Sequence, residues 1–413
     1  MAYDIHNYDR ELEKGRDAVK KASISERNKE IIFEFEKYLI VRNISKPRII
    51  KYLGELRRTA IKLGKDLDKA NKQDIIDLVC DMQQGSYTEW TKKTNKAVLK
   101  RFYKWLKGGD KRYPEEVEWI DTHMPRSKRT LPKTEDLLTQ GDISKLIEAA
   151  NNLRDRALIA MLWESGGRIG EIGNQEVGGI SFDKYGGVVT LNGKTGPRAV
   201  RLINSASYLA NWLSIHPKRD DKHAPLWVSI GNNNRNRFIS YGMILQMLKK
   251  LFKKVGINKR FNPHIFRHSR ATFLANHLTE FQMNQYFGWV QGSDMPSTYV
   301  HLSGKETDTA LLKLNGIEVN ENKEEQTQKP RICKRCDTIN PALNKFCCKC
   351  GAVLDVKSAM EMEAKFKEQI DARNKTDNIM NNLIKDPEVQ EFLARKLEQY
   401  NREKNTGSLS NAT

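Results

Sequence analysis

Apolar side chains recur at helical spacing early in the chain, and this pattern predicts a bundle of helices over residues 25–107. The first apolar stripe consists of Ile31, Ile32, Phe35, Tyr38 and Leu39. Three more helices are predicted in ISKPRIIKYLGELRRTAIKLG, ANKQDIIDLVCDM and TKKTNKAVLKRFYKWLKG. The last of these carries basic side chains away from its apolar stripe, at Lys100, Arg101, Lys104 and Lys107. A basic helical bundle can clamp DNA, although a basic helix face is often only solvated.

Helical periodicity returns in residues 136–318, where we expect helices around one small antiparallel sheet. Helices are predicted in TQGDISKLIEAA, NNLRDRALIAMLWES, YGMILQMLKKLFKKVG, PHIFRHSRATFLANHL, TEFQMNQYFGW and GKETDTALLKLNG. Between them, VVTLNGKTGPRAVRLI has two β-branched runs around Asn192-Gly193, which is a hairpin signal. The expected fold class is therefore mainly α with a small antiparallel β-sheet (α+β).

The remaining segments differ in composition from these two regions. Residues 108–135 are rich in Gly, Pro and basic residues and are interpreted as a linker between domains. A cysteine-rich module follows the second helical region. The expected segments outside the two helical regions are a basic N-terminal extension at 1–24, the linker, the module at 331–354, a helical tail at 355–402 and a polar terminus at 403–413. In the tail, Asp386-Pro387-Glu388 predicts the start of the last helix.

The charge of the chain narrows the choice of partner. Its 413 residues carry a formal net charge of +19 and a pI near 9.5, which favours encounter with polyanions. No run of 18 apolar residues is present, and the charged N-terminus does not look like a signal peptide. We therefore expect a cytoplasmic, nucleoid-associated protein that binds double-stranded DNA.

Two basic or polar side chains in the predicted helix PHIFRHSRATFLANHL suit a phosphate group. Asn262 is a good N-cap and Pro263 a good first residue, so His264 and Arg267 fall in the first turn. Their spacing of three puts them on one face, where backbone N–H groups and the helix dipole favour an anion. Taken alone, the same pattern also fits a surface helix with two solvated side chains.

Two further cations have local sequence contexts that position them. Arg168 follows a pair of glycines in SGGRIGE, and Glu171 can orient it from one turn away. Lys194 comes directly after Asn192-Gly193, which places its ammonium at the tip of the predicted hairpin. Each motif is weak by itself, because hairpin lysines are usually only solvated.

Taken together and in this order, the motifs resemble the tyrosine recombinase (phage integrase) family. GGRIGEI, NGKTGPRAVRL, HIFRHSRATFLA and FGW-VQGSDMPSTYVH follow one another as the family signature requires. The signature positions are Arg168, Lys194, His264, Arg267, Trp289 and Tyr299. Trp289 stands where many members have histidine, and the stretch from Trp289 to Tyr299 is one residue longer than in many bacterial members. The resemblance spans about residues 25–318 and is archaeal in style.

The resemblance implies an enzyme that cuts and rejoins DNA. Tyr299 would attack the scissile phosphate, forming a 3′-phosphotyrosyl link and a free 5′-hydroxyl. Arg168 and Arg267 would hold the non-bridging oxygens, whereas Lys194 would protonate the leaving oxygen. His264 would exchange a proton with the tyrosine, and Trp289 would hold a phosphate oxygen. By the same resemblance, catalysis would need no divalent metal and no nucleotide cofactor, and four protomers would assemble on two DNA sites.

Five of the six cysteines lie within 18 residues, which indicates a metal site rather than disulfides in a reducing compartment. The pairs Cys333-x-x-Cys336 and Cys347-x-x-Cys350 have the spacing of a tetrahedral structural Zn²⁺ site and resemble the zinc ribbons of many archaeal proteins. Cys348 is interpreted as a spare thiol. Cys80 is interpreted as a small buried hydrophobe.

Two other functions remain open at this stage. A type IB topoisomerase would share the nucleophile and would relax supercoils as a monomer without a specific site. A non-catalytic DNA-binding regulator could keep the fold and the zinc ribbon without the reaction. The complete set of six residues favours a recombinase over the regulator.

Overall fold

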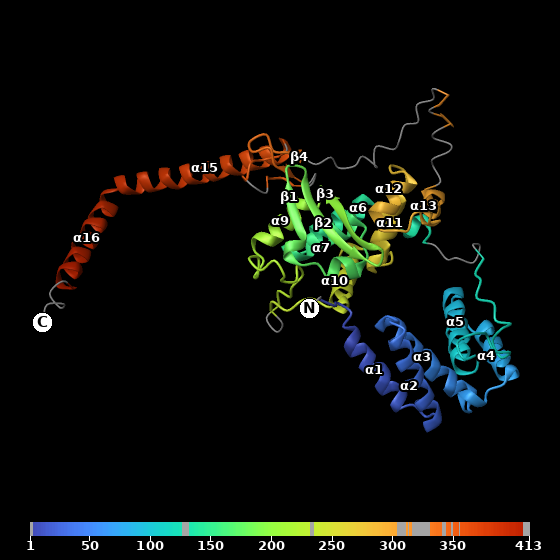
Figure 1. The fold of residues 1–413 in the computed structure, drawn as a ribbon. Coiled ribbons are helices and arrows are strands. Elements are labelled where there is room, and N and C mark those ends of the chain that lie inside the picture. Colours follow the sequence, from blue (N-terminus) through green and yellow to red (C-terminus); the bar gives the residue numbers. More distant parts are fainter. Residues whose placement is uncertain are drawn as a thin grey trace. The chain divides into compact units, whose positions relative to one another are not determined.

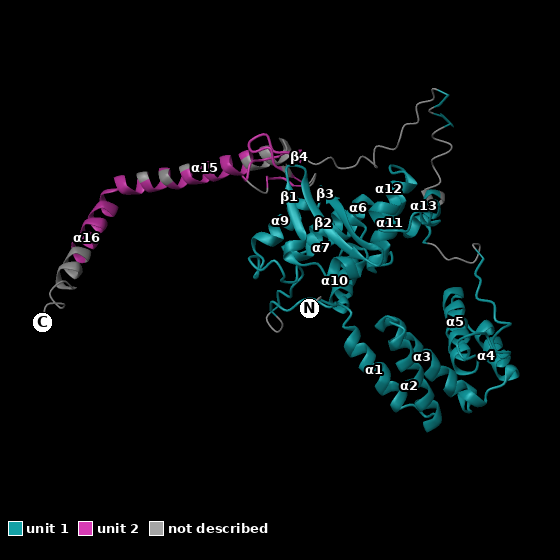
Figure 2. Cartoon of the chain, viewed as in Figure 1, with its two compact units in different colours: residues 1–327 teal, residues 328–413 magenta. Residues whose placement is uncertain are grey.

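The computed structural model describes residues 3–125, 132–231, 235–303, 311–312, 314–315, 331–340, 344–347, 350–354 and 356–407. The chain forms two compact units, residues 1–327 and residues 328–413 (Figure 2). Among its described residues, the first unit contains three hydrophobic clusters, one in a helical domain and two in the domain that carries the signature residues.

The helical domain contains every helix that the apolar pattern predicts for this region (Figure 1). Its helices are α1 (Tyr8–Lys20), α2 (Glu26–Val41), α3 (Lys46–Leu63), α4 (Lys72–Gln84) and α5 (Glu89–Leu106). Ser25 caps α2, and Asn71 forms a capping box with Asp74 at the start of α4. Phe35 and Phe102, both almost fully buried, meet edge to face at 5.2 Å in the centre of the core.

Two local features of this domain differ from what the sequence suggested. Residues 8–20, assigned above to an N-terminal extension, form α1, and its Leu12 and Val19 lie in the same core as Phe35. Cys80 is exposed on α4, so the prediction of a buried thiol is wrong. The buried side chains of α4 are Ile75, Leu78 and Val79.

The basic side chains of α5 are largely engaged within the domain. Lys100 Nζ donates to the carbonyl of Ile120 at 2.7 Å, and Lys107 Nζ donates to that of Ala70 at 2.6 Å. Arg101 Nη2 donates to the hydroxyl of a tyrosine on α2 at 2.8 Å. These three cations therefore hold the ends of the bundle together, in addition to any role in binding a polyanion.

The second domain is built around helix α7 (Leu153–Ser165), whose side chains are mostly buried and whose position is labelled in Figure 1. Its elements are α6 (Gln140–Ala149), α7 (Leu153–Ser165), α8 (Ile169–Gly173), β1 (Ile180–Asp183), β2 (Gly186–Gly193), β3 (Gly196–Leu202), α9 (Ala206–Ser214), α10 (Tyr241–Val255), α11 (Pro263–Ala275), α12 (Glu280–Phe287) and α13 (Met295–Ser303). Most side chains of α7 are buried, as expected for a helix that is apolar on nearly all sides. The helices predicted up to residue 289 are present, whereas most of the one predicted at 304–316 lies outside the described residues.

A three-stranded antiparallel sheet of order β1-β2-β3 lies beside α7 and confirms the predicted sheet. In the β2–β3 hairpin, Asn192 pairs with Pro197 and Gly193 pairs with Gly196. The turn therefore consists of Lys194 and Thr195, and the predicted turn at Asn192-Gly193 is wrong by two positions. Lys194 still lies at the tip of the hairpin, where it is exposed.

The first residues of the chain pack on the second domain rather than on the helical one. Ile5 is 2% exposed and belongs to the second domain's core. Its backbone N–H donates to Asn174 Oδ1 at 3.0 Å, and its carbonyl accepts from the N–H of Tyr241 at 2.8 Å. Gly173, at the end of α8, leaves room for the Ile5 side chain, since a Cβ atom there would lie 2.5 Å from its Cδ1.

The second unit contains the cysteine module and the helical tail. Strands β4 (Arg331–Ile332) and β5 (Ile339–Asn340) pair antiparallel in the module. The tail forms α15 (Val356–Lys385) and α16 (Pro387–Gly407), and Asp386 caps α16 through a bond from the N–H of Glu388 at 2.9 Å. This start of the last helix is the one predicted.

Candidate active site and cysteine cluster

Arg168 is fixed at the start of α8 by Glu171. Gly166 turns the chain after α7 with a φ of 54°, where a Cβ atom would come within 2.6 Å of the Phe287 ring. Arg168 then donates its backbone N–H to Glu171 Oε2 at 2.9 Å and its Nη1 to Oε1 at 2.8 Å. The turn and the carboxylate together hold the guanidinium in one orientation.

The start of α11 carries His264 and Arg267 in the predicted local geometry. Asn262 caps the helix by accepting a bond from the N–H of Ile265 at 3.1 Å. Arg267 is 6% exposed, and its Nη1 donates to the carbonyl of Gly166 at 3.0 Å. His264 is exposed one turn before it. Arg267 is thus tied to the glycine turn that precedes Arg168.

The tip of the β2–β3 hairpin meets Arg168 at a single carbonyl. The hydroxyl of Thr195 donates to the carbonyl of Gly288 at 3.2 Å, and Arg168 Nη2 donates to the same oxygen at 3.5 Å. Lys194 precedes Thr195 in the turn and is exposed. Lys194 is therefore connected to the group through its neighbour rather than through its own ammonium.

Trp289 and Tyr299 lie against each other and beside Arg267. Their rings are stacked, with centroids 5.5 Å apart and an angle of 5° between the planes. Trp289 also stacks on Phe287 at 4.8 Å, and the Arg267 Cζ lies 5.5 Å from the centroid of the Trp289 ring. Tyr299, on α13, is 2% exposed. A chain of contacts therefore joins four of the six signature residues, with His264 one turn before Arg267 and Lys194 at the hairpin tip.

The protonation of these groups follows from burial and from their mutual charges. Burial raises the pKa of Tyr299 to about 12, although Arg267 acts in the opposite direction. Burial, and then the charge of Arg168, lower the pKa of Arg267 to about 10, so the guanidinium stays charged at neutral pH. Partial desolvation, Arg267 and Arg168 lower the pKa of His264. At neutral pH the site therefore holds two guanidiniums, a neutral histidine and a protonated phenol.

Such a group of side chains can bind a phosphodiester and supply a nucleophile to it. Guanidinium groups match the non-bridging oxygens of phosphate and remain charged when partly buried. Tyr299 has the only side chain among the six signature residues that could form a covalent phosphoester here, once its proton is removed.

Residues 136–306 match the sequence profile of the phage integrase family. These residues therefore form a phage integrase domain. Tyrosine recombinase XerA of Pyrococcus horikoshii is 25% identical over 291 residues, which cover 70% of this chain and 95% of that protein. A tyrosine recombinase of Thermosipho africanus is 26% identical over 293 residues, covering 69% of this chain and 99% of that protein.

Two solved structures share the integrase-family fold. The XerH site-specific recombinase bound to palindromic difH substrate, in a post-cleavage complex, has a TM-score of 0.53 at 16% identity, covering 76% of this chain and 100% of that chain. A lambda integrase dimer bound to a COC′ core site has a TM-score of 0.52 at 16% identity, covering 67% of this chain and 78% of that chain. At such identities the likeness establishes the fold alone.

Arg198 is a member of this group of side chains that the sequence reasoning missed. Its Nη2 donates to Glu171 Oε2 at 2.7 Å, and its Nε donates to the carbonyl of Tyr286 at 2.9 Å. Glu171 therefore joins Arg168 on one side and Arg198 on the other. A signal was available, because Arg198 lies two residues before the buried Val200 in β3 and so shares its inward face.

His268 is a second residue that the sequence reasoning missed. Its Nδ1 lies 2.8 Å from the hydroxyl oxygen of Tyr299. The available signal was its spacing of four from His264, which puts both imidazoles on one face of α11. His268 is thus the side chain that directly contacts the phenol oxygen in this structure.

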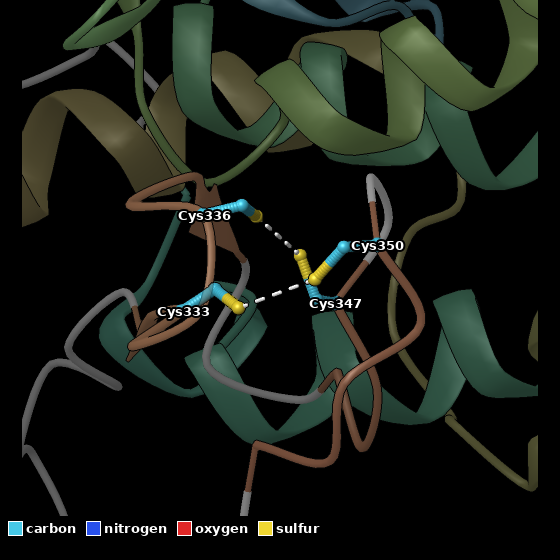
Figure 3. A group of neighbouring side chains, drawn as sticks. All are labelled: Cys333, Cys336, Cys347 and Cys350. Atoms are coloured by element: carbon cyan, nitrogen blue, oxygen red, sulfur yellow. Dashed lines mark hydrogen bonds between the residues drawn. The ribbon is translucent and has the colours of Figure 1, made fainter.

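The four cysteines of the two C-x-x-C pairs come together in the second unit (Figure 3). Their sulfur atoms all lie within 4.8 Å of one another, and Cys333 and Cys347 are buried. Tetrahedral Zn²⁺ with Zn–S bonds of about 2.3 Å would place its sulfurs roughly 3.8 Å apart. These four thiols could therefore hold a metal ion. Cys348 lies outside the described residues.

None of the helices that the structure describes is both long enough and apolar enough to cross a bilayer.

Proposed function

We propose that this protein is a site-specific DNA recombinase that cuts and rejoins duplex DNA through a 3′-phosphotyrosyl intermediate on Tyr299. The observation that carries this proposal is the contact chain from Tyr299 through Trp289 to Arg267 and on to the Gly166 turn before Arg168. It brings one nucleophile and two phosphate-binding cations into one site. The family match of residues 136–306 supports the same conclusion.

The reaction exchanges one phosphoester for another. Tyr299 Oη would bond to phosphorus while the bond from phosphorus to the 5′-oxygen breaks. Arg168 and Arg267 would stabilise the charge that grows on the non-bridging oxygens, and the Trp289 N–H would add a further donor. His264 would take the phenol proton, and Lys194, mobile at its hairpin tip, would give a proton to the departing 5′-oxygen.

The covalent link conserves the energy of the phosphodiester, so religation would need no nucleotide. Attack by the 5′-hydroxyl of a second strand reverses each proton transfer and releases Tyr299. We propose that the helical domain and the second domain both contact the duplex, as expected for a chain with a net charge of +19. The reaction would accordingly take place on nucleoid DNA in the cytoplasm.

We further propose that four protomers act on two DNA sites. Support comes from a solved structure of similar fold, a lambda integrase tetramer bound to a Holliday junction, with a TM-score of 0.50 at 16% identity. For the cysteine cluster we propose a structural Zn²⁺ held by Cys333, Cys336, Cys347 and Cys350. Four thiolate ligands complete a tetrahedral shell, which leaves no position for a substrate.

Covalent capture tests the proposed reaction. Nicked, end-labelled duplexes tiled across the genomic DNA that flanks the coding region would be incubated with the full chain and separated under denaturing conditions. We expect a slow, protease-sensitive band with the native protein and none with Tyr299→Phe, which should still bind DNA. An adduct formed by Tyr299→Phe would contradict the assignment of the nucleophile.

The same protein and DNA substrates distinguish a recombinase from a topoisomerase and from a non-catalytic regulator. A recombinase should form adducts on one sequence and exchange strands between two copies of it. Relaxation of any supercoiled plasmid by a monomer would instead indicate a topoisomerase. DNA binding with no adduct on any duplex would indicate a regulator. Arg267→Ala should slow adduct formation by about 100- to 1,000-fold through lost charge stabilisation.

A further inference from the structure

The Tyr299 hydroxyl occupies a shielded position in the DNA-free protein. The side chain is 2% exposed and belongs to a hydrophobic cluster with Phe287 and Met283. Trp289 stacks on its ring. Its hydroxyl oxygen lies 2.8 Å from Nδ1 of His268. A phenol held in this way is not placed to reach a phosphorus atom that arrives from solvent.

The charge state of His268 is set by its surroundings on α11 and the preceding loop. Burial, followed by interactions with His264, Arg267 and Arg260, lowers the pKa of His268 to about 4. Its imidazole is therefore neutral at neutral pH. The buried phenol hydrogen then has an acceptor if Nδ1 is the unprotonated nitrogen, so the hydroxyl donates and the imidazole accepts.

This hydrogen bond stabilises the phenol in its protonated form rather than activating it. A base with a pKa of about 4 does not take a proton from a phenol whose pKa is about 12. An acceptor bound to the hydroxyl favours the neutral phenol, because the phenolate has no hydrogen to donate.

We propose that His268 is a positioning residue that holds the nucleophile Tyr299 protonated and shielded from solvent until DNA fills the site. The inference rests on the proposed function for its statement that Tyr299 is the nucleophile. The bond links α11 to α13, so it fixes the position of the helix that carries the tyrosine as well as that of the hydroxyl. Cleavage would require this bond to break.

Amide hydrogen exchange on the DNA-free full chain tests the proposal without any reaction. His268→Leu removes the acceptor, and exchange in peptides from Met295 to Val300 should become at least tenfold faster. His268→Asn places a side-chain oxygen near the position of Nδ1 and should restore protection. The matched control is His277→Leu, the same change at an exposed histidine just beyond the end of α11, which should leave α13 unchanged.

The other partner of the bond provides an independent check on misfolding. Tyr299→Phe lacks only the hydroxyl, so it should speed exchange in α13 as His268→Leu does. The double variant should exchange no faster than either single variant, because both changes remove one interaction. Additive effects would show that the two changes act separately. If amide exchange in α13 of His268→Leu were as slow as in the native protein, the bond would not hold this helix in place. Either result would overturn the proposal.

The rate of adduct formation at saturating DNA then shows whether His268 holds Tyr299 in place or transfers its proton. Because the bond must break before attack, His268→Leu should form adducts at a rate no lower than that of the native protein. A hundredfold loss in His268→Leu that His268→Asn does not restore would identify a proton-transfer group and would contradict the proposal. If no variant forms an adduct, native protein included, the proposed function fails, whereas the exchange result still decides the role of His268.

Discussion

Trp289 stacks on Tyr299 with only 5° between the two ring planes. Trp289 also contacts Phe287, which accepts a hydrogen bond from Arg267 through its carbonyl. Trp289 therefore touches the proposed nucleophile, Tyr299, and also touches Phe287, whose carbonyl holds Arg267, a proposed phosphate-binding arginine. This position gives Trp289 two separable properties, a stacking face and an N–H donor.

Substitution of Trp289 should separate these properties. Trp289→Phe keeps a stacking ring but removes the donor, so we expect adduct formation to slow by roughly 10- to 100-fold with Tyr299 still shielded. Trp289→His restores a ring N–H, the group found here in many members of the family, and should recover most of the rate. Single-turnover cleavage measures both. Native rates in Trp289→Phe would show that only stacking matters.

Glu171 should matter both for the stability of the domain and for the reaction. Glu171→Gln keeps the shape but removes the charge between Arg168 and Arg198, so we expect a loss of about 2 kcal/mol at neutral pH. Adduct formation should slow as well, because Arg168 is no longer held. Urea unfolding and single-turnover cleavage are the measurements. A variant as stable and as active as the native protein would contradict this role.

The difference in the free energy of unfolding between the native protein and Glu171→Gln should decrease as the pH falls. Burial would raise the pKa of the Glu171 carboxyl, but the bonds from Arg198 and Arg168 lower it below its ordinary value of 4.5. Its contribution is therefore complete above pH 4.5 and is lost as pH falls through the lower, folded pKa. Unfolding of the native protein and Glu171→Gln should converge in acid. A constant difference down to strong acid would contradict the assignment.

The cysteine cluster should bind metal without affecting the reaction centre. Metal analysis of the purified protein should find about one Zn²⁺ per chain. Cys333→Ser should lose the metal and expose residues 331–354 to protease, whereas Cys80→Ser, at an exposed position on α4, should change neither. Full metal content in Cys333→Ser would contradict the proposed ligand set.

The contact of Ile5 with α8 should support Arg168 from behind. Ile5→Asp would place an unpaired carboxylate in a site that is 2% exposed, so the segment should detach at a cost of about 2 kcal/mol from lost apolar burial. Hydrogen exchange in α8 should rise as a result. Val41→Asp, at a position that is 82% exposed, is the matched control. Unchanged protection of α8 from exchange in Ile5→Asp would show that the segment around Ile5 does not stabilise α8.

Periodicity predicted the helices well because each buries a continuous apolar stripe. The stripe of α4 also explains why the prediction for Cys80 was wrong. Ile75, Leu78 and Val79 lie on one side of the helix, and Cys80 projects about 100° beyond Val79. Residue type suggested burial there, but the position on the helix did not.

The errors and omissions in the site have a common physical origin, because each depends on which groups pair in the folded chain and not on local residue preference. The hairpin turn moved to Lys194 and Thr195 because the ladder of β2 and β3 continues through Asn192 and Gly193. Local turn preference alone could not show this. The contact of His268 with Tyr299 joins residues 31 positions apart, and that of Arg198 with Glu171 joins residues 27 apart. The spacing of the signature selected the proposed reacting groups but not the side chains that contact them.

The path of the chain at Asn7 limits how the helical domain can move. Residues up to His6 contact the second domain, and α1 begins at Tyr8. Two residues of extended chain span roughly 7 Å. The first turn of α1 is therefore a pivot: as long as Ile5 stays seated, that point cannot leave the second domain, and any movement of the helical domain keeps this end close to it.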